Sequence, residues 1–230
     1  MKDSDPNRLI AVITGDVVGS ARFAGAARAR LHNGLRQAAD DLERAFAAYV
    51  PYPIAFFRGD SWQFLVTEPS MAIRMGLYFR SASQSLFGSA AFDTRMAIGV
   101  GTISFLPEDD VSAGDGEAFR RSGEALNDLG RERRMVFIGP PSMSPFEQSA
   151  ISAITGLIDA IASNWTARQA QAVAGALRGW TQQEIGSNRF EPPITQQGVA
   201  QHLDRASWDS IEDALEVVEN ETARLHPIHD

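Results

Sequence analysis

The feature that most constrains the fold is an uncharged run near the N-terminus, LIAVIT, which ends in Gly15 and Asp16. A continuous apolar run of this length, followed by a turn signal, is typical of a central β-strand that is buried on both faces. We therefore expect a strand over residues 9–14. The carboxylate that follows it has three explanations: a turn residue, a helix cap, or a ligand for a charged group.

The hydrophobic periodicity predicts an alternation of strands and helices over the next part of the chain. The expected elements are a helix at 25–49, a hairpin at 54–66, a helix at 69–87, a strand at 93–105, a helix at about 117–129 and a strand at 135–138. The β-α-β-β-α-β order is that of a ferredoxin-like fold with an addition. We expect an antiparallel sheet with helices on one face.

A segment rich in Pro, Gly and Ser, GPPSMSP at residues 139–145, indicates a boundary between two parts of the chain. We expect a ferredoxin-fold domain over residues 1–140 and an all-helical domain over residues 146–230. Three threonines are expected to cap short helices in the second domain: Thr166, Thr181 and Thr195. The predicted fold class is therefore α+β, followed by an all-α unit.

Composition narrows the class of protein. The chain has 230 residues, of which 44% are hydrophobic, and a formal net charge of -8. It has no cysteine, which excludes disulfides and thiolate metal sites. Its apolar runs are far shorter than the ~20 residues that span a bilayer, so we expect a cytoplasmic protein without a membrane partner. The acidic balance, which is concentrated in residues 151–230, disfavours non-specific binding to nucleic acid.

Two carboxylates form the first candidate site. Asp16 follows the first strand and Asp60 lies in the hairpin sequence RGDS. In a β-α-β-β start the first and third strands are neighbours, so both acids can face one edge of the sheet. Their mutual repulsion would be removed by Mg²⁺ or Mn²⁺, which prefer carboxylate oxygens. The alternative is that both acids are ordinary turn residues.

The backbone after Asp16 is a candidate phosphate cradle. Its N–H groups enter a predicted helix, and such groups can hold phosphate. The residues concerned are Val17, Val18, Gly19 and Ser20. A metal ion beside a phosphate cradle is the arrangement that nucleoside triphosphate chemistry requires.

These motifs carry a resemblance to a known family. ITGDVVGSARF resembles the first metal motif of class III nucleotidyl cyclases, FFRGDSWQFLV resembles the hairpin that carries their second metal aspartate, and RMAIGVGTIS resembles the strand after their second helix. The cyclase resemblance covers about residues 9–138. Nearly the whole chain resembles the SatD family, small bacterial proteins with a cyclase-like front and a helix-turn-helix back. The resemblance implies a cyclase-like fold, a metal pair at Asp16 and Asp60, and a nucleotide ligand.

The sequence also departs from the cyclase pattern. Phe56 stands where a purine-selecting lysine is expected. The nearest cation is Arg58, which is a candidate phosphate ligand although it points to the opposite face by strand alternation. The region that matches the late cyclase motif, VSAGDGEAFRRSGEAL, offers Arg120 and Arg121 for a triphosphate but no asparagine. Because a missing transition-state cation costs orders of magnitude in rate, we expect nucleotide binding with little or no catalysis. The alternative for Arg120 and Arg121 is a solvated helix surface.

The second candidate site lies in WTQQEIGSNRFEPPITQQGVAQHL, which resembles the helix-turn-helix of sigma-factor-like and MarR-like regulators. Thr195 would cap the recognition helix. The predicted DNA contacts are Arg189, Thr195, Gln196, Gln197 and Gln201, since glutamine can read adenine in the major groove. The predicted turn, GSNRFEPP, is longer than the usual three or four residues. The alternative is a helical bundle that mediates dimer contacts.

The leading hypothesis from the sequence is a cytoplasmic, dimeric transcriptional regulator. Its cyclase-like domain would bind a nucleotide with Mg²⁺ or Mn²⁺, and its helix-turn-helix would contact DNA. The first alternative is an active nucleotidyl cyclase or oligonucleotide synthase that uses ions held by Asp16 and Asp60. The second alternative is a non-catalytic dimerisation scaffold.

Overall fold

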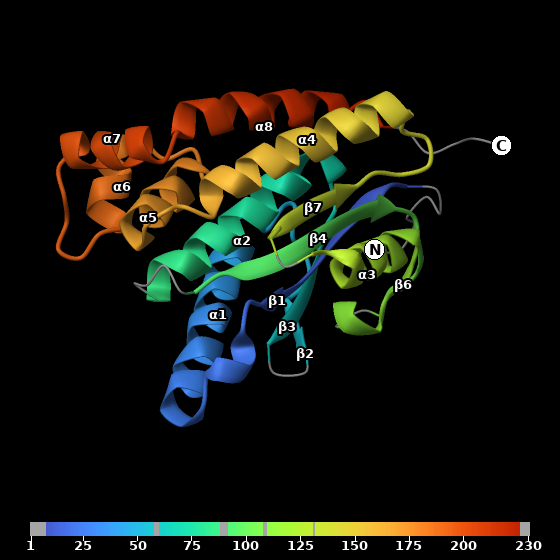
Figure 1. The fold of residues 1–230 in the computed structure, drawn as a ribbon, viewed down its shortest axis with the longest axis horizontal. Coiled ribbons are helices and arrows are strands. Elements are labelled where there is room, and N and C mark those ends of the chain that lie inside the picture. The colour runs from blue at the N-terminus through green and yellow to red at the C-terminus, as the bar shows by residue number, and fades with distance from the viewer. Residues whose placement is uncertain (1–7, 58–59, 88–91, 108–109, 131, 226–230) are drawn as a thin grey trace.

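The computed structural model describes residues 8–57, 60–87, 92–107, 110–130 and 132–225. A five-stranded sheet lies at the centre, in the order β2-β3-β1-β4-β7 (Figure 1). Its strands are β1 (Ile10–Val17), β2 (Ala55–Phe57), β3 (Ser61–Val66), β4 (Thr94–Gly101) and β7 (Met135–Ile138). A separate ribbon pairs β5 (Ile103–Phe105) with β6 (Asp115–Gly116).

The helices in chain order are α1 (Gly25–Ala45), α2 (Ala72–Phe87), α3 (Glu117–Asp128), α4 (Pro145–Ala162), α5 (Ala167–Ala176), α6 (Gln182–Asn188), α7 (Gln196–Arg205) and α8 (Trp208–Thr222). Short 3-10 helices are η1 (Ser20–Arg22), η2 (Pro69–Met71) and η3 (Val111–Ala113). The predicted hairpin, helices and strands up to residue 138 correspond to elements of this list with shifted ends, except that the single strand predicted at 93–105 is divided into β4 and β5, which belong to two different sheets. The mixed α+β class is confirmed.

The first strand has the central position that its apolar run predicts. β1 lies between β3 and β4 and is antiparallel to both. Ala11 and Ile13 face the main core with α1 and α2, whereas Ile10 and Val12 face a second apolar cluster that includes Phe119 of α3. Both faces of the strand are therefore buried, as expected for an uncharged run.

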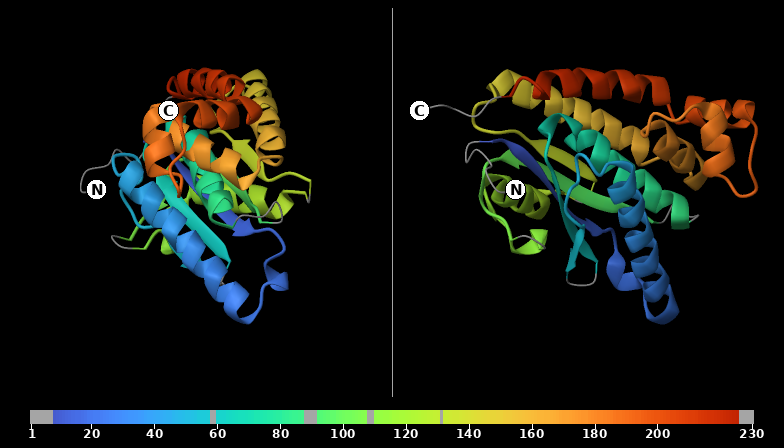
Figure 2. Two further views of the ribbon diagram at one scale, coloured as in Figure 1. Left: turned by 90° about the vertical axis from the view of Figure 1, so that its left-hand side faces the viewer. Right: turned by 180° about the vertical axis from the view of Figure 1, so that it is seen from behind.

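The prediction of an antiparallel sheet with helices on one face is wrong in two respects. β7 runs parallel to β4, because the chain crosses over through α3 before it returns to the sheet. α3 covers the face opposite α1 and α2, as the front and back views show (Figures 1 and 2). The physical reason is that the central strands are apolar on both faces, and each face needs a cover.

Two glycines of β4 allow α3 to lie close to the sheet. A Cβ atom on Gly99 would come within 2.5 Å of the backbone nitrogen of Ser122. A Cβ atom on Gly101 would come within 2.6 Å of the Glu117 Cβ. Any side chain at these positions would push the helix away from the strand, so the small residues determine how closely the second face is packed.

The helical half shares its core with the sheet. One cluster of buried side chains runs from β1 through α2 to α5, α7 and α8, and includes Ile13, Phe79, Val173, Leu203 and Leu215. It crosses the proline- and glycine-rich segment at residues 139–145. The division at 1–140 and 146–230 stays a prediction about chain organisation, but the described residues on its two sides pack into a continuous interior.

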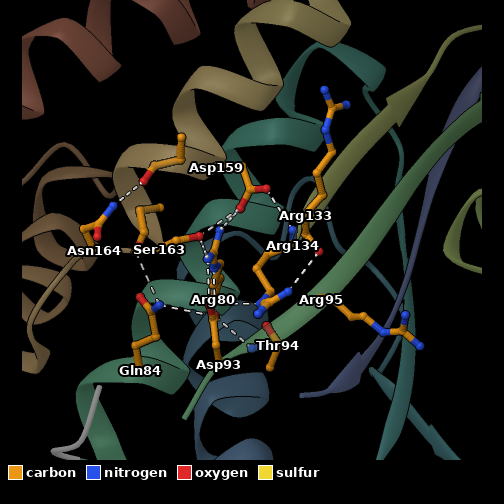
Figure 3. Close-up of polar contacts among 12 residues, drawn as sticks. Arg80, Gln84, Asp93, Thr94, Arg95, Arg133, Arg134, Asp159, Ser163 and Asn164 are labelled. Carbon is orange, nitrogen blue, oxygen red and sulfur yellow. Dashed lines mark hydrogen bonds and ion pairs between the residues drawn. The ribbon is translucent and has the colours of Figure 1, made fainter. Parts of the chain in front are cut away.

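A buried arginine joins the two halves (Figure 3). Arg80 of α2 is fully buried and donates to both carboxylate oxygens of Asp93, at 2.8 and 2.6 Å. It also donates to Asp159 of α4 at 2.7 Å and to the hydroxyl of Ser163 at 2.8 Å. The second oxygen of Asp159 accepts from the backbone N–H of Arg134 at 2.8 Å. We refer to Arg80, Asp93 and Asp159 as the Arg80 clamp.

Arg80 stays charged in the interior. Burial alone would lower the pKa of Arg80, but hydrogen bonds and charge from Asp93 and Asp159 raise it above its ordinary value. A buried cation with two carboxylates is stable only while all its partners remain, because an uncompensated buried charge is expensive.

We expect Asp159→Ala to lower the free energy of unfolding by about 3–5 kcal/mol, because it removes one counter-charge from a buried guanidinium. Urea denaturation followed by circular dichroism measures the change. Glu221→Ala is the control: it removes an acid that ion-pairs with Arg224 in solvent, and it should leave the midpoint almost unchanged. Equal effects of the two variants would contradict the role given to the clamp.

Candidate functional site

Asp16 lies on β1 itself, one residue before the strand ends. Its Cα is paired with Ser61 on β3 and with Arg95 on β4. Arg95 donates to both of its carboxylate oxygens, from Nε at 2.8 Å and from Nη2 at 2.9 Å. Asp16, a predicted metal ligand, is therefore held by Arg95, which no sequence motif indicated.

Asp60 stands at the same edge of the sheet. It immediately precedes Ser61, and Ser61 is the direct partner of Asp16 across the β1–β3 pair. Asp60 itself lies in the turn before β3, and a shared ion between the two acids stays a prediction. Within the described ranges, no group of three or more His, Asp or Glu side chains is arranged to hold a metal ion.

The Asp16–Arg95 pair is reachable from solvent. The side chains are 22% and 32% exposed, respectively. The hydrogen bond to Asp16 raises the pKa of Arg95, with partial burial acting against it, so this guanidinium is a permanent positive charge. Arg95 also donates to the carbonyl of Leu129 at 3.3 Å, just beyond α3. One carboxylate and one fixed cation therefore form an ion pair at this edge, and Asp60 lies one residue before the strand partner of Asp16.

The predicted phosphate cradle has a different local structure from the one expected. Val17 is part of β1, and the N–H of Val18 donates to the carbonyl of Asp93 at 2.9 Å. Gly19 has a positive φ of 64° and precedes the short η1, which begins at Ser20. α1 begins only at Gly25. Val17–Ser20 therefore do not form the first turn of α1, and the N–H of Val18 is already bound.

The two predicted phosphate-binding arginines that the structure describes have their contacts away from Asp16. Arg58 lies outside the described residues. Arg120 is exposed and pairs with Asp115 at 3.0 Å, and Arg121 donates to the carbonyl of Gly139 at 3.1 Å. The Arg121 Cβ lies close to the position of Gly99, which is four residues along β4 from Arg95, roughly 13 Å at strand spacing.

A buried polar cluster lies next to Asp16 on the same face of the sheet, and the sequence analysis missed it. Gln63 of β3 donates to the hydroxyl of Thr14 at 2.8 Å. That hydroxyl is 2.9 Å from the hydroxyl of Ser122 on α3. The cluster satisfies its polar groups internally and closes the space between the sheet and α3, so it forms a rigid floor beside the Asp16–Arg95 pair.

The helical half contains the predicted capped helices. Thr166 and Thr181 form reciprocal capping boxes, with Gln169 and Glu184 respectively, and Thr195 accepts from the N–H of Gly198 at 3.2 Å. The three predicted caps are confirmed. On α7 the exposed side chains include Gln196, Gln197 and Gln201, whereas Val199 and Leu203 are buried.

Arg189, a predicted DNA contact, is engaged elsewhere in the fold. Its Nη1 donates to Asp41 of α1 at 2.6 Å, and its Nη2 donates to the phenol oxygen of Tyr78 on α2. Burial raises the pKa of Tyr78 to about 12, against the charge of Arg189, which lowers it. The protonated phenol also donates to Asp41 at 2.7 Å. Arg189 thus fastens the end of α6 to α1 and α2.

Comparisons with known proteins do not assign the chain to a family. No protein-family model matches the chain, and no curated protein matches it. Among solved structures, the crystal structure of the guanylyl cyclase Cya2 is a weak structural neighbour: it is 14% identical, has a TM-score of 0.42, and the match covers 56% of this chain and 74% of that one. The SatD and helix-turn-helix resemblances stay predictions.

No helix in the described part of the chain combines the length and the apolar composition needed to cross a bilayer.

We expect Arg189→Met to lower the free energy of unfolding by about 2 kcal/mol, because it removes the charged donor to Tyr78 and the shorter of the two arginine contacts of Asp41, which keeps only Arg178 at 3.2 Å. Urea denaturation measures the change. Arg205→Met is the matched control, since Arg205 is exposed on α7 and should contribute little to stability. A stability equal to that of the unmodified protein would show that Arg189 is free for another role.

Proposed function

We propose that the protein is a non-catalytic regulator that binds a nucleotide together with Mg²⁺ or Mn²⁺ at the sheet edge around Asp16. The observation that carries the proposal is the solvent-accessible pair of Asp16 and Arg95, with Asp60 beside the strand partner of Asp16. The edge offers carboxylate oxygens for a hard cation and a guanidinium for phosphate oxygens.

The donor set fits the way in which Mg²⁺ is usually bound. Magnesium commonly takes one or two carboxylates and completes its shell with water and substrate phosphates, and it does not need a cage made only of protein groups. Asp16 and Asp60 would hold the ion, and the ion would neutralise phosphate charge. Arg95, released from Asp16, would pair with a phosphate of the same ligand. The ion pair between Asp16 and Arg95 is thereby exchanged for two, one between Asp16 and the metal ion and one between Arg95 and a phosphate. No charge is left unpaired.

The same strand would transmit occupancy to the helical half. Arg95, which holds Asp16, and Asp93, which belongs to the Arg80 clamp, are two residues apart at the start of β4. The N–H of Val18 is also bound to the carbonyl of Asp93. A ligand that moves Arg95 therefore acts on a segment that is anchored to α2 and α4. It can change the conformation of the helical half if its contacts differ between the ligand-free and the ligand-bound conformations.

Calorimetric titration with ATP and GTP, each with and without Mg²⁺ or Mn²⁺, tests the proposal. We expect binding only when nucleotide and metal are both present, and loss of binding in Asp16→Asn and Arg95→Ala. Asp115→Asn, a change to an exposed acid, should bind as the unmodified protein does. The absence of heat with every combination, or equal binding by Asp16→Asn, would overturn the proposal.

The enzymatic alternative has its own readout in the same samples. Release of pyrophosphate from ATP or GTP, lost in Asp60→Ala, would identify an active cyclase or nucleotidyl transferase in place of a sensor. Asp60 is chosen because replacing a metal ligand would abolish product formation, whereas replacing an ordinary turn residue would not.

A second candidate function is DNA binding by α7, which we infer from the exposed glutamines. Gln196, Gln197 and Gln201 project into solvent from a helix that Val199 and Leu203 hold in the core. Glutamine can bond in a bidentate manner to adenine in the major groove. With Arg189 engaged by Asp41, few phosphate contacts support this surface, and a dimer would be needed for useful affinity.

Selection from a pool of random DNA duplexes tests this candidate. We expect enrichment of A-containing sites, and a loss of affinity of about tenfold or more for Gln197→Ala or Gln201→Ala, as for removal of one base contact. Gln183→Ala on the exposed side of α6 is the control and should bind normally. Failure to enrich any sequence would remove DNA as a ligand of α7.

A further inference from the structure

The outer face of α4 is unusual for a surface helix. Among the described residues, five large hydrophobic side chains are exposed, and three of them lie on α4 and the adjacent α8. These are Phe146 at 82%, Leu157 at 66% and Val217 at 53% exposure. α4 and α8 lie side by side along one outer edge of the molecule (Figures 1 and 2).

The exposed face of α4 carries no charge. Its acids are Glu147, which completes the capping box with Ser144, and Asp159, which is buried in the Arg80 clamp. The apolar and small residues along the exposed face alternate at spacings of four and three: Phe146, Ala150, Ala153, Leu157 and Ala160. This is the spacing of the seam along which two helices of a coiled coil pack together. We call these five residues the α4 seam.

The two flanks of the α4 seam carry opposite charges. On the β7 side, the guanidinium of Arg133 lies beside Gly156, 3.8 Å from the position of a Cβ atom there, and it points away from the Arg80 clamp (Figure 3). No ion pair is formed by Arg133 within the described chain. On the other side, α8 exposes Asp209, Asp213 and Glu216, which likewise form no ion pair within those residues.

The levels of these charges along the helices also match. α4 and α8 run in opposite directions, and the indole N–H of Trp165, just after α4, donates to the carbonyl of Ala206, just before α8, at 3.0 Å. Counting nine residues back along α4 and nine forward along α8 from this contact brings Gly156 to the level of Leu215, between Asp213 and Glu216. Arg133 and Asp213 therefore stand within one helical turn of the same level, on opposite sides of the α4 seam.

We propose that the α4 seam is the interface with a second copy of this chain, in which the two α4 helices run parallel. A two-fold axis parallel to α4 exchanges the flanks, so Arg133 of each copy meets the acidic α8 of the other at the level of Asp213. A two-fold axis across the helices would place acidic α8 against acidic α8. The flanking charges thus select the parallel arrangement, and the seam brings Phe146 against Phe146 and Leu157 against Leu157.

A membrane surface fits this face less well. Amphipathic helices that lie on membranes carry basic residues beside their apolar face. Here the apolar face continues into Val217 and the acids of α8, which anionic lipids would repel.

The proposed dimer does not depend on nucleotide or DNA binding.

Sedimentation equilibrium of the full chain tests the interface. We expect a dimer that Leu157→Glu weakens at least tenfold, because a charge would be placed in the centre of an apolar contact. Phe105→Glu changes a side chain that is 60% exposed on β5 and is not part of the α4 seam, so it should leave the dimer unchanged. A monomer at every concentration, or a dimer insensitive to Leu157→Glu, would overturn the proposal.

The charged flanks supply a rescue experiment. Arg133→Glu should weaken the dimer, and Arg133→Glu combined with Asp213→Arg should restore it. Circular dichroism confirms that each variant is folded. A dimer that both the single and the double variant leave unchanged would exclude the parallel arrangement.

Cysteine crosslinking reports the orientation directly, since the chain has no cysteine of its own. In a parallel pair, Ala150→Cys and Ala160→Cys should each crosslink to the same position of the second copy under mild oxidation. An antiparallel pair brings neither position against itself, so the absence of both crosslinks would contradict the parallel arrangement. A monomer that floats with anionic vesicles would identify a lipid surface as the occupant instead.

Discussion

Arg80 is the interaction on which the arrangement of the whole chain depends. It is a fully buried cation whose counter-charges come from two distant segments, Asp93 before β4 and Asp159 in α4. Because a lone buried charge would cost several kcal/mol, α2, the start of β4 and α4 must come together in one geometry. The apolar core that surrounds the clamp then continues from the sheet into the helical half. The chain after residue 145 is therefore packed as part of the same body.

The candidate ligand edge and the clamp share a short segment of chain. Arg95 binds Asp16 on the α3 side of the sheet, and two residues earlier Asp93 binds Arg80 on the α2 side. The proposed ligand would replace Arg95 at Asp16, so its first effect would fall on the segment that anchors α4. α4 also carries the seam proposed for the second copy, and the clamp therefore lies between the ligand edge and the dimer face. In a regulator, this arrangement would connect the ligand edge to the dimer face through a few residues in direct contact.

Local patterns predicted the elements well, because they depend on periodicity and capping within a few residues. The strand at residues 9–14 and the threonine caps are such features. Contacts that depend on strand register could not be predicted in this way: Arg95 reaches Asp16 only because β4 pairs with β1 in one register. Gly99 and Gly101 indicate that another element can approach β4 closely. Without the order of the strands in the sheet, however, the sequence does not show that this element is α3. Arg80 gave a similar hint, as an arginine directly after the apolar residues Leu77, Tyr78 and Phe79 of α2.

The central claim is that the sheet and the helical half form one cooperative unit held by the Arg80 clamp. The four tryptophans allow a direct test, because Trp62 lies in β3 and Trp165 lies between α4 and α5. Two variants, one keeping only Trp62 and one keeping only Trp165, are unfolded in urea and followed by fluorescence. The account predicts that each fluorescence transition coincides with the loss of helix measured by circular dichroism in the same variant. A sheet transition and a helical transition separated in urea concentration would contradict it.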